Sequence, residues 1–109
     1  MTNYLVIYVT CPTLEEAEKI GEFMVSSRYA ACVNIIPKIK SIYWWEGELQ
    51  REEEVLLVFK TVAELLPVFE ENIKKHHTYS VPEITAVNID LGSEEYLSWL
   101  KKETLNLRG

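Results

Sequence analysis

The side chains best suited to chemistry in this sequence are two adjacent histidines, His76 and His77. Imidazole is a good ligand for copper, zinc and nickel. Successive residues of a helix point about 100° apart, so both rings can bind one ion only if the helix ends between them. The alternative is that one histidine caps the last carbonyl groups of a helix while the other continues its apolar stripe. As a metal site the pair is weak and needs a further ligand, such as Glu83 or a group from a neighbouring subunit.

The two cysteines, Cys11 and Cys32, differ in their predicted surroundings. Cys11 precedes Pro12 at the start of an expected helix, where the N-terminus favours the thiolate, so it is the better candidate for a reactive or metal-binding thiol. Packing in the core or a loop is its alternative interpretation. Cys32 lies within an apolar run and is expected to behave as a small buried hydrophobe. Neither has CxxC or CxxH spacing, so we expect no zinc finger or thioredoxin-type motif.

Three further polar residues, Lys60, Tyr79 and Glu83, could line a cleft between subunits, where a lysine and a phenol would hold a small anionic ligand. A buried structural pair explains them equally well. The sequence has no Ser-His-Asp order, no phosphate-binding glycine loop and no carboxylate pair placed for acid-base work. We therefore expect a protein that is not an enzyme.

Composition limits the class of protein and its partners. The 109 residues match a single domain spanning residues 1–109. The chain has 17 acidic and 11 basic residues, a net charge of −6, so we expect neither nucleic acid nor anionic membranes as partners. It contains no apolar run of about 20 residues, and we expect a soluble cytoplasmic protein with reduced thiols. An acidic band surrounds the turn near Gly47; a solvated face is its default interpretation and weak cation attraction the alternative.

The first half of the chain predicts a strand, a helix and a long hairpin. An apolar run over Tyr4–Cys11 predicts an internal strand. The spacing of Thr13 and Glu16 predicts a capping box for a helix that continues to about Tyr29. A strand begins at Ala30 and is interrupted at Pro37, which a bulge or an edge position tolerates. The chain then turns near Gly47 and returns from about Glu53 to Lys60.

The second half repeats this order. Thr61 and Glu64 have capping-box spacing for a helix as far as His76, although Pro67 moves its true start towards Leu65. Pro82 opens a last strand, and Ser93 starts a short helix whose apolar residues, Tyr96, Leu97, Trp99 and Leu100, have the spacing of core residues. The order β-α-β-β-α-β with a terminal helix predicts an α+β ferredoxin-like domain.

The aromatic strand end predicts assembly. In this fold the helices cover one face of the sheet, yet the expected strands are apolar on both faces. Trp44 and Trp45 are successive strand residues that point to opposite faces, so one ring would fill the core and the other would contact a neighbour. We therefore predict a closed homo-oligomer whose interface includes Tyr43, Trp44, Trp45 and Glu46.

The ordered set of these segments resembles the CutA family of divalent-cation tolerance proteins, and the match covers nearly the whole chain. The segments are Ala30-Ala31-Cys32-Val33-Asn34 and Pro37, Tyr43-Trp44-Trp45-Glu46-Gly47, Lys60-Thr61, His76-His77-Thr78-Tyr79, Val81-Pro82-Glu83-Ile84 and Tyr96-Leu97-Ser98-Trp99-Leu100. The resemblance implies a tight homotrimer with strand pairing around the tryptophans and a cytoplasmic role in tolerance of copper and other divalent metals. A PII-like trimeric small-ligand or signalling module and a structural scaffold are the alternative functions.

The resemblance also implies copper binding through a first-strand cysteine and the histidine pair. His76 and His77 stand at the family's paired positions, and Thr78 replaces a usual proline. The cysteine position holds Val9, whereas Cys11 stands two residues later on the same strand face. Two strand residues move a sulfur atom by about 6 to 7 Å. The resemblance thus makes His76, His77 and Cys11 the metal candidates, with the sulfur of Cys11 displaced from the position that the family's cysteine takes.

Overall fold

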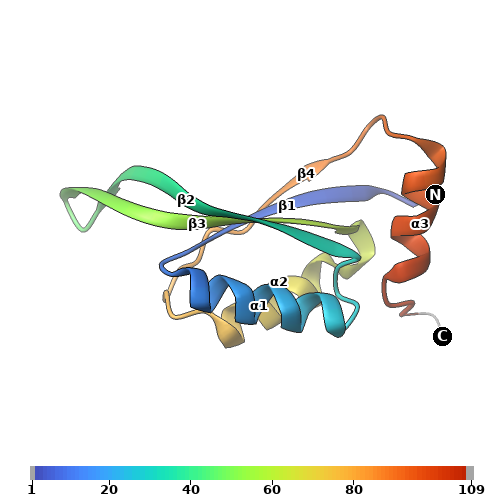
Figure 1. The fold of residues 1–109 in the computed structure, drawn as a ribbon, viewed down its shortest axis with the longest axis horizontal. Coiled ribbons are helices and arrows are strands. Elements are labelled where there is room, and N and C mark those ends of the chain that lie inside the picture. The colour runs from blue at the N-terminus through green and yellow to red at the C-terminus, as the bar shows by residue number, and fades with distance from the viewer. Residues whose placement is uncertain (1, 108–109) are drawn as a thin grey trace.

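The structure, a computed structural model, describes residues 2–107 and forms two layers, a sheet and a pair of helices (Figure 1). The four strands lie in the order β2-β3-β1-β4, and every neighbouring pair is antiparallel. Helices α1 and α2 cover one face, and α3 lies at one end of the sheet. The α+β ferredoxin-like prediction is confirmed. The elements are β1 (Tyr4–Cys11), α1 (Leu14–Ser26), β2 (Cys32–Trp45), β3 (Glu48–Val62), a 3-10 turn η1 (Ala63–Leu65), α2 (Leu66–His76), β4 (Thr85–Asn88) and α3 (Glu94–Glu103).

The core lies between the sheet and the two helices. Alternate residues of β1 point towards the helices, so that Val9 and Cys11 are both buried on the same face. Phe59 of β3 meets Phe69 of α2 edge to face, with ring centroids 4.9 Å apart. Each fully buried side chain of this size contributes roughly 1.5 to 3 kcal/mol through the area it removes from water. This packing fixes the end of β1 against the helix layer.

Helix α1 begins as predicted, but α2 does not. The Thr13 hydroxyl accepts a hydrogen bond from the Glu16 amide and caps α1. The capping box predicted at Thr61 is wrong, because β3 continues to Val62 and the Thr61 hydroxyl donates to the Tyr29 carbonyl. The α-helix starts only at Leu66, close to the boundary that Pro67 predicts.

The hairpin of β2 and β3 extends beyond the helix layer (Figure 1). Its register shifts between Ile36 and Ile39 and β2 is an edge strand, so Pro37 lies at a bulge of an edge strand. At the tip, Glu46 and Gly47 have φ angles of 49° and 79°, as the tight turns of two-residue hairpins require. Trp44 is 72% exposed and Trp45 is 47% exposed. The prediction that one ring fills the domain core is wrong, because no helix lies beneath this part of the hairpin.

The C-terminal segment contributes less to the core than predicted. Ser93 caps α3 by accepting from the Tyr96 amide, and Leu100 is its one fully buried residue. Tyr96 and Trp99 stack on each other, with centroids 5.6 Å apart, but each is 41% exposed. The last strand is also shorter than expected, with regular pairing only over Thr85–Asn88. Within residues 2–107 no helix has the length and apolar character that crossing a bilayer requires.

Candidate functional site

Helix α2 ends between the two histidines, which separates their side chains. His76 is the last helical residue, and His77 is the C-cap with extended backbone (φ −92°, ψ 142°). The His76 Nδ1 atom lies 2.8 Å from the Asn72 carbonyl and therefore donates to it, while the ring packs against Phe23 with centroids 4.2 Å apart. His76 thus caps the helix by its side chain and stays exposed, and His77 turns inward.

His77 is buried and both of its ring nitrogens have backbone partners. Nε2 lies 2.7 Å from the Thr10 carbonyl at the end of β1, and Nδ1 accepts from the Tyr79 amide at 3.0 Å. A carbonyl only accepts and an amide N–H only donates, so Nε2 carries the hydrogen and the ring is neutral in this arrangement. His77 therefore joins the end of β1 to the loop that follows α2.

Glu16 of α1 completes this junction. One carboxylate oxygen, Oε1, accepts from the Thr78 hydroxyl at 2.8 Å, and the other, Oε2, lies 3.3 Å from the Thr78 amide and 3.4 Å from Nδ1 of His77. A sulfur ligand is also close: potential ligand atoms of Cys11, Glu16 and His77 all lie within 4.8 Å of one another. A thiol, a carboxylate and an imidazole are together a donor set suited to zinc or copper. We call these three residues the buried cluster.

The thiol of the buried cluster is strongly held in its protonated form. Burial, and then the negative charges of Glu16 and Glu54, raise the pKa of Cys11 to about 12. The expectation that the helix N-terminus favours the thiolate is therefore wrong, because desolvation and two carboxylates outweigh the helix dipole. Cys32 also differs from expectation, since it is only half-buried and its sulfur lies 3.7 Å from the Tyr96 hydroxyl.

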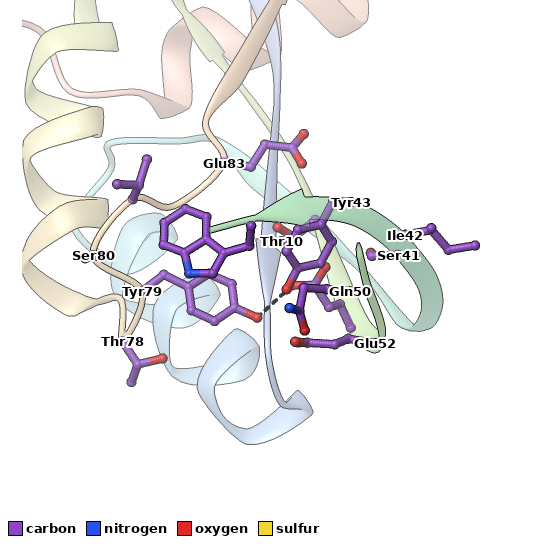
Figure 2. A pocket seen from close by; sticks show the side chains of 13 residues that line it. Thr10, Ser41, Ile42, Tyr43, Gln50, Glu52, Thr78, Tyr79, Ser80 and Glu83 are labelled. Atoms are coloured by element: carbon purple, nitrogen blue, oxygen red, sulfur yellow. Dashed lines mark hydrogen bonds between the residues drawn. The ribbon is translucent and has the colours of Figure 1, made fainter. Parts of the chain in front are cut away.

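Within one chain the predicted cleft residues do not meet in one place. Lys60 lies far along β3 and donates to the Asn34 side chain on β2. Tyr79 and Glu83 do share a cavity of about 750 Å³ between the hairpin and the loop after α2, and Lys60 is not among its walls. Figure 2 shows the Tyr79 ring extending from that loop towards the hairpin residues Gln50 and Glu52. Within one chain a lysine and phenol pair for an anion is thus not formed, and the cleft between subunits stays a prediction.

A buried carboxylate that sequence reasoning missed stands in this cavity. Glu54 of β3 is only 6% exposed, and its Oε2 accepts from the Tyr79 hydroxyl at 2.7 Å (Figure 2, dashed line). Burial, and then this hydrogen bond and the charge of Glu54, raise the pKa of Tyr79. In the sequence Glu54 is the last of three consecutive glutamates, and its signal was its position directly before the apolar run from Val55 to Phe59.

The predicted interface residues all lie at the exposed end of the hairpin. Tyr43 and Trp45 line the cavity, whereas Trp44 faces the other side of the hairpin opposite Leu49. Glu46 is exposed in the turn. A second missed residue is Glu16, whose capping-box position was recognised but whose approach to His77 depends on how α1 and α2 pack.

Comparison with known proteins gives consistent matches along nearly the whole chain. Residues 5–103 match the family described as CutA1 divalent ion tolerance protein. The chain is 45% identical over 100 residues to protein CutA 1, chloroplastic, of Oryza sativa, covering 92% of this chain and 56% of that protein. It is 44% identical over 99 residues to the divalent-cation tolerance protein CutA of Thermus thermophilus, covering 91% and 96%. The chain thus spans little more than half the length of the plant relatives.

Solved structures agree. A structure of the Thermus thermophilus divalent cation tolerance protein has a TM-score of 0.91 at 44% identity, covering 93% of this chain and 98% of that one. CutA1 from Oryza sativa has a TM-score of 0.92 at 44% identity and covers 94% of each chain. The fold and sites define a ferredoxin-like α+β domain with a buried Cys/Glu/His cluster and an acidic cavity beside its hairpin. The chain belongs to the CutA1 divalent ion tolerance family.

Proposed function

We propose that this protein is not an enzyme and contributes to tolerance of divalent metal ions by binding copper, or another divalent ion, at the buried cluster. Relatives in the family carry the name divalent-cation tolerance protein. The observation that carries the proposal is the grouping of Cys11, Glu16 and His77 within 4.8 Å. Among the described residues it is the one such group of three, and His76 is not part of it.

The hydrogen bonds of His77 suit this role. A metal-binding histidine commonly donates its second N–H to a backbone carbonyl, which fixes the ring and its tautomer. Nε2 of His77 already does so with Thr10, which leaves Nδ1, the nitrogen nearer Glu16, as the ligand atom. Binding would replace the Tyr79 amide as the partner of Nδ1 and would release the Cys11 proton.

The proposal is tested by calorimetric titration of the purified protein with copper and zinc salts. Cys11→Ala should weaken binding by at least about tenfold, since it removes one of three ligands. His76→Ala is the matched control, because it removes an imidazole one residue away and should leave the affinity unchanged. A loss with His76→Ala and none with Cys11→Ala would transfer the site to the exposed histidine and contradict the buried cluster.

Proton release gives the metal site a pH signature. Because the pKa of Cys11 is raised to about 12, its thiol is protonated throughout the neutral range. The apparent metal affinity should therefore rise by about tenfold per pH unit between pH 6 and 8, for one proton displaced. A flat profile would show that the thiol is not a ligand.

The proposal includes a homotrimer in the cytoplasm, without nucleic-acid or membrane partners. Apolar side chains of the hairpin support self-assembly: Ile42 is 66% exposed, Trp44 is 72% exposed, and Trp44 pairs directly with Leu49. Light scattering should give three times the mass of one chain, and Trp44→Ala should raise the fraction of monomer. A wild-type monomer at micromolar concentration would contradict this part.

A second function, a PII-like module that binds a small ligand, is favoured by the cavity that Tyr79 and Glu83 line. Because Lys60 of the same chain is not a wall of that cavity, the walls suit a different ligand from the small anion that the sequence suggested.

A further inference from the structure

The cavity between the hairpin and the loop after α2 has a one-sided charge. Three carboxylates, those of Glu52, Glu54 and Glu83, belong to its walls, and the described lining residues include no lysine, arginine or histidine. The remaining walls are hydroxyl, amide and apolar groups. The net charge of the walls therefore repels a small anion and attracts a cation.

Glu54 gives this attraction a specific target. Its side chain is 94% removed from solvent by the packing of one chain alone, yet among residues 2–107 no basic side chain forms an ion pair with it. The Tyr79 hydroxyl is its hydrogen-bond partner. Buried charges in proteins are almost always paired, because an unpaired one keeps a large desolvation penalty. The cavity thus contains a carboxylate that lacks its counter-charge.

The other walls show what kind of cation fits. Tyr43, Trp45 and Tyr79 present aromatic rings to the cavity, which favour a cation or an apolar group over their faces. A bare divalent ion would need several ligand atoms close together, but the three carboxylates do not form such a group among the described residues. A volume of about 750 Å³ is also that of a small-molecule site.

We propose that this cavity binds a small organic cation, an ammonium or guanidinium group on an apolar stem, whose N–H groups pair with the buried carboxylate of Glu54 while the stem lies against the aromatic rings. This site is separate from the buried cluster, although the loop of residues 77–79 contributes to both.

Titration with 2-phenylethylammonium tests the proposal on the full chain in its native assembly. The neutral analogue 2-phenylethanol has the same apolar body without the charge, and magnesium chloride supplies a charge without an apolar body. We expect the ammonium to bind at least tenfold more tightly than the alcohol, and magnesium not to displace it at equal concentration. Tighter binding of the alcohol, or full displacement by magnesium, would overturn the proposal.

A pair of variants isolates the buried carboxylate. Glu54→Gln keeps an acceptor for the Tyr79 hydroxyl and removes only the charge, so it should weaken 2-phenylethylammonium binding at least tenfold. Glu53→Gln removes the same charge from the preceding residue. Glu53 is exposed, its Oε1 lies 3.6 Å from Nζ of Lys38, and it is not a cavity wall. Glu53→Gln should change the affinity less than twofold. Equal losses in both variants would show that the net charge of the protein, and not the carboxylate of Glu54, controls binding, and would overturn the site.

The counter-charge could also come from a neighbouring copy of the chain. In that case the wild type would not bind 2-phenylethylammonium, and light scattering would show that Glu54→Gln weakens assembly while Glu53→Gln does not. That result would overturn a small-molecule site. Binding of the ammonium with an unchanged oligomeric state in Glu54→Gln supports it.

Discussion

The buried cluster and the acidic cavity both take residues from the loop of residues 77–79, and they differ in how their polar atoms are satisfied. In the cluster, His77 has a partner on each ring nitrogen and Cys11 keeps its proton. In the cavity, Glu54 is buried with a single hydroxyl partner and no basic side chain among the described residues. The buried cluster thus has its hydrogen-bond partners within the chain and can be called the closed region. The cavity, whose buried carboxylate lacks a counter-charge, can be called the open region.

This difference has a thermodynamic meaning. A ligand of the closed region must replace hydrogen bonds that already stabilise the fold, so only the part of its binding energy beyond that loss appears as affinity. A ligand of the open region supplies a missing partner and relieves a desolvation penalty. The closed region should therefore dominate stability, and the open region should respond most to ligands.

The largest expected effect is the loss of His77. His77→Ala leaves the Thr10 carbonyl and the Tyr79 amide without their ring partners, and each buried orphan group costs roughly 1 to 3 kcal/mol. We expect a loss of about 3 kcal/mol in the free energy of unfolding, measured with urea. His76→Ala removes an exposed side chain with one carbonyl contact and should lose about 1 kcal/mol or less. Equal losses would break the distinction between the two histidines.

A smaller effect is expected for the bond that links the loop to the cavity. Tyr79→Phe removes the hydroxyl that donates to Glu54, and a hydrogen bond to a charged group contributes roughly 1.5 to 3 kcal/mol, so we expect a loss near 1.5 kcal/mol at pH 7 for this half-buried ring.

Alkaline pH sharpens that prediction. The pKa of Tyr79 is raised in the folded protein, so the folded state holds the phenol proton more tightly than the unfolded chain does. The resulting stability is complete below a pH of about 10, the ordinary tyrosine pKa, and is lost as the pH rises above it. Urea unfolding at pH 8 and pH 10.5 should show a larger loss for the wild type than for Tyr79→Phe. Parallel losses would mean that neither burial nor Glu54 raises the pKa of this phenol.

The sequence predicts the elements of this protein better than its sites. Periodicity identified the strands and the helix layer, because the same residues that set the period also fill the core. The capping-box spacing failed as a signal at Thr61, because the same spacing occurs there inside a strand that sheet pairing extends. The alternation of strand residues also failed to place Trp44 and Trp45, because a strand pattern does not show where the covering helices end.

The sites depend on distances that the sequence does not contain. Lys60 and Glu54 are six residues apart on one strand and hence about 20 Å apart, so Lys60 lies far from the cavity of its own chain. The carboxylate of Glu16 meets His77 only because α1 and α2 pack with these ends adjacent. The histidine pair was identified from residue type and from the family resemblance, but which ring points inward was set by the last turn of α2.

The smallest expected effect tests whether burial or charge keeps the Cys11 thiol of the closed region protonated. Burial is the main cause of the raised pKa of Cys11, and the charge of Glu16 is the next. Glu16→Gln keeps an acceptor for Thr78 and removes that charge, so Cys11 should react with iodoacetamide less than about tenfold faster at pH 8.5, since desolvation still opposes the thiolate. Mass spectrometry can follow each site, with half-buried Cys32 as the internal reference. If Cys11 in Glu16→Gln reacted as fast as Cys11 of the urea-unfolded chain, the charge of Glu16 rather than burial would protect the thiol. The closed and open regions would then differ in electrostatics alone.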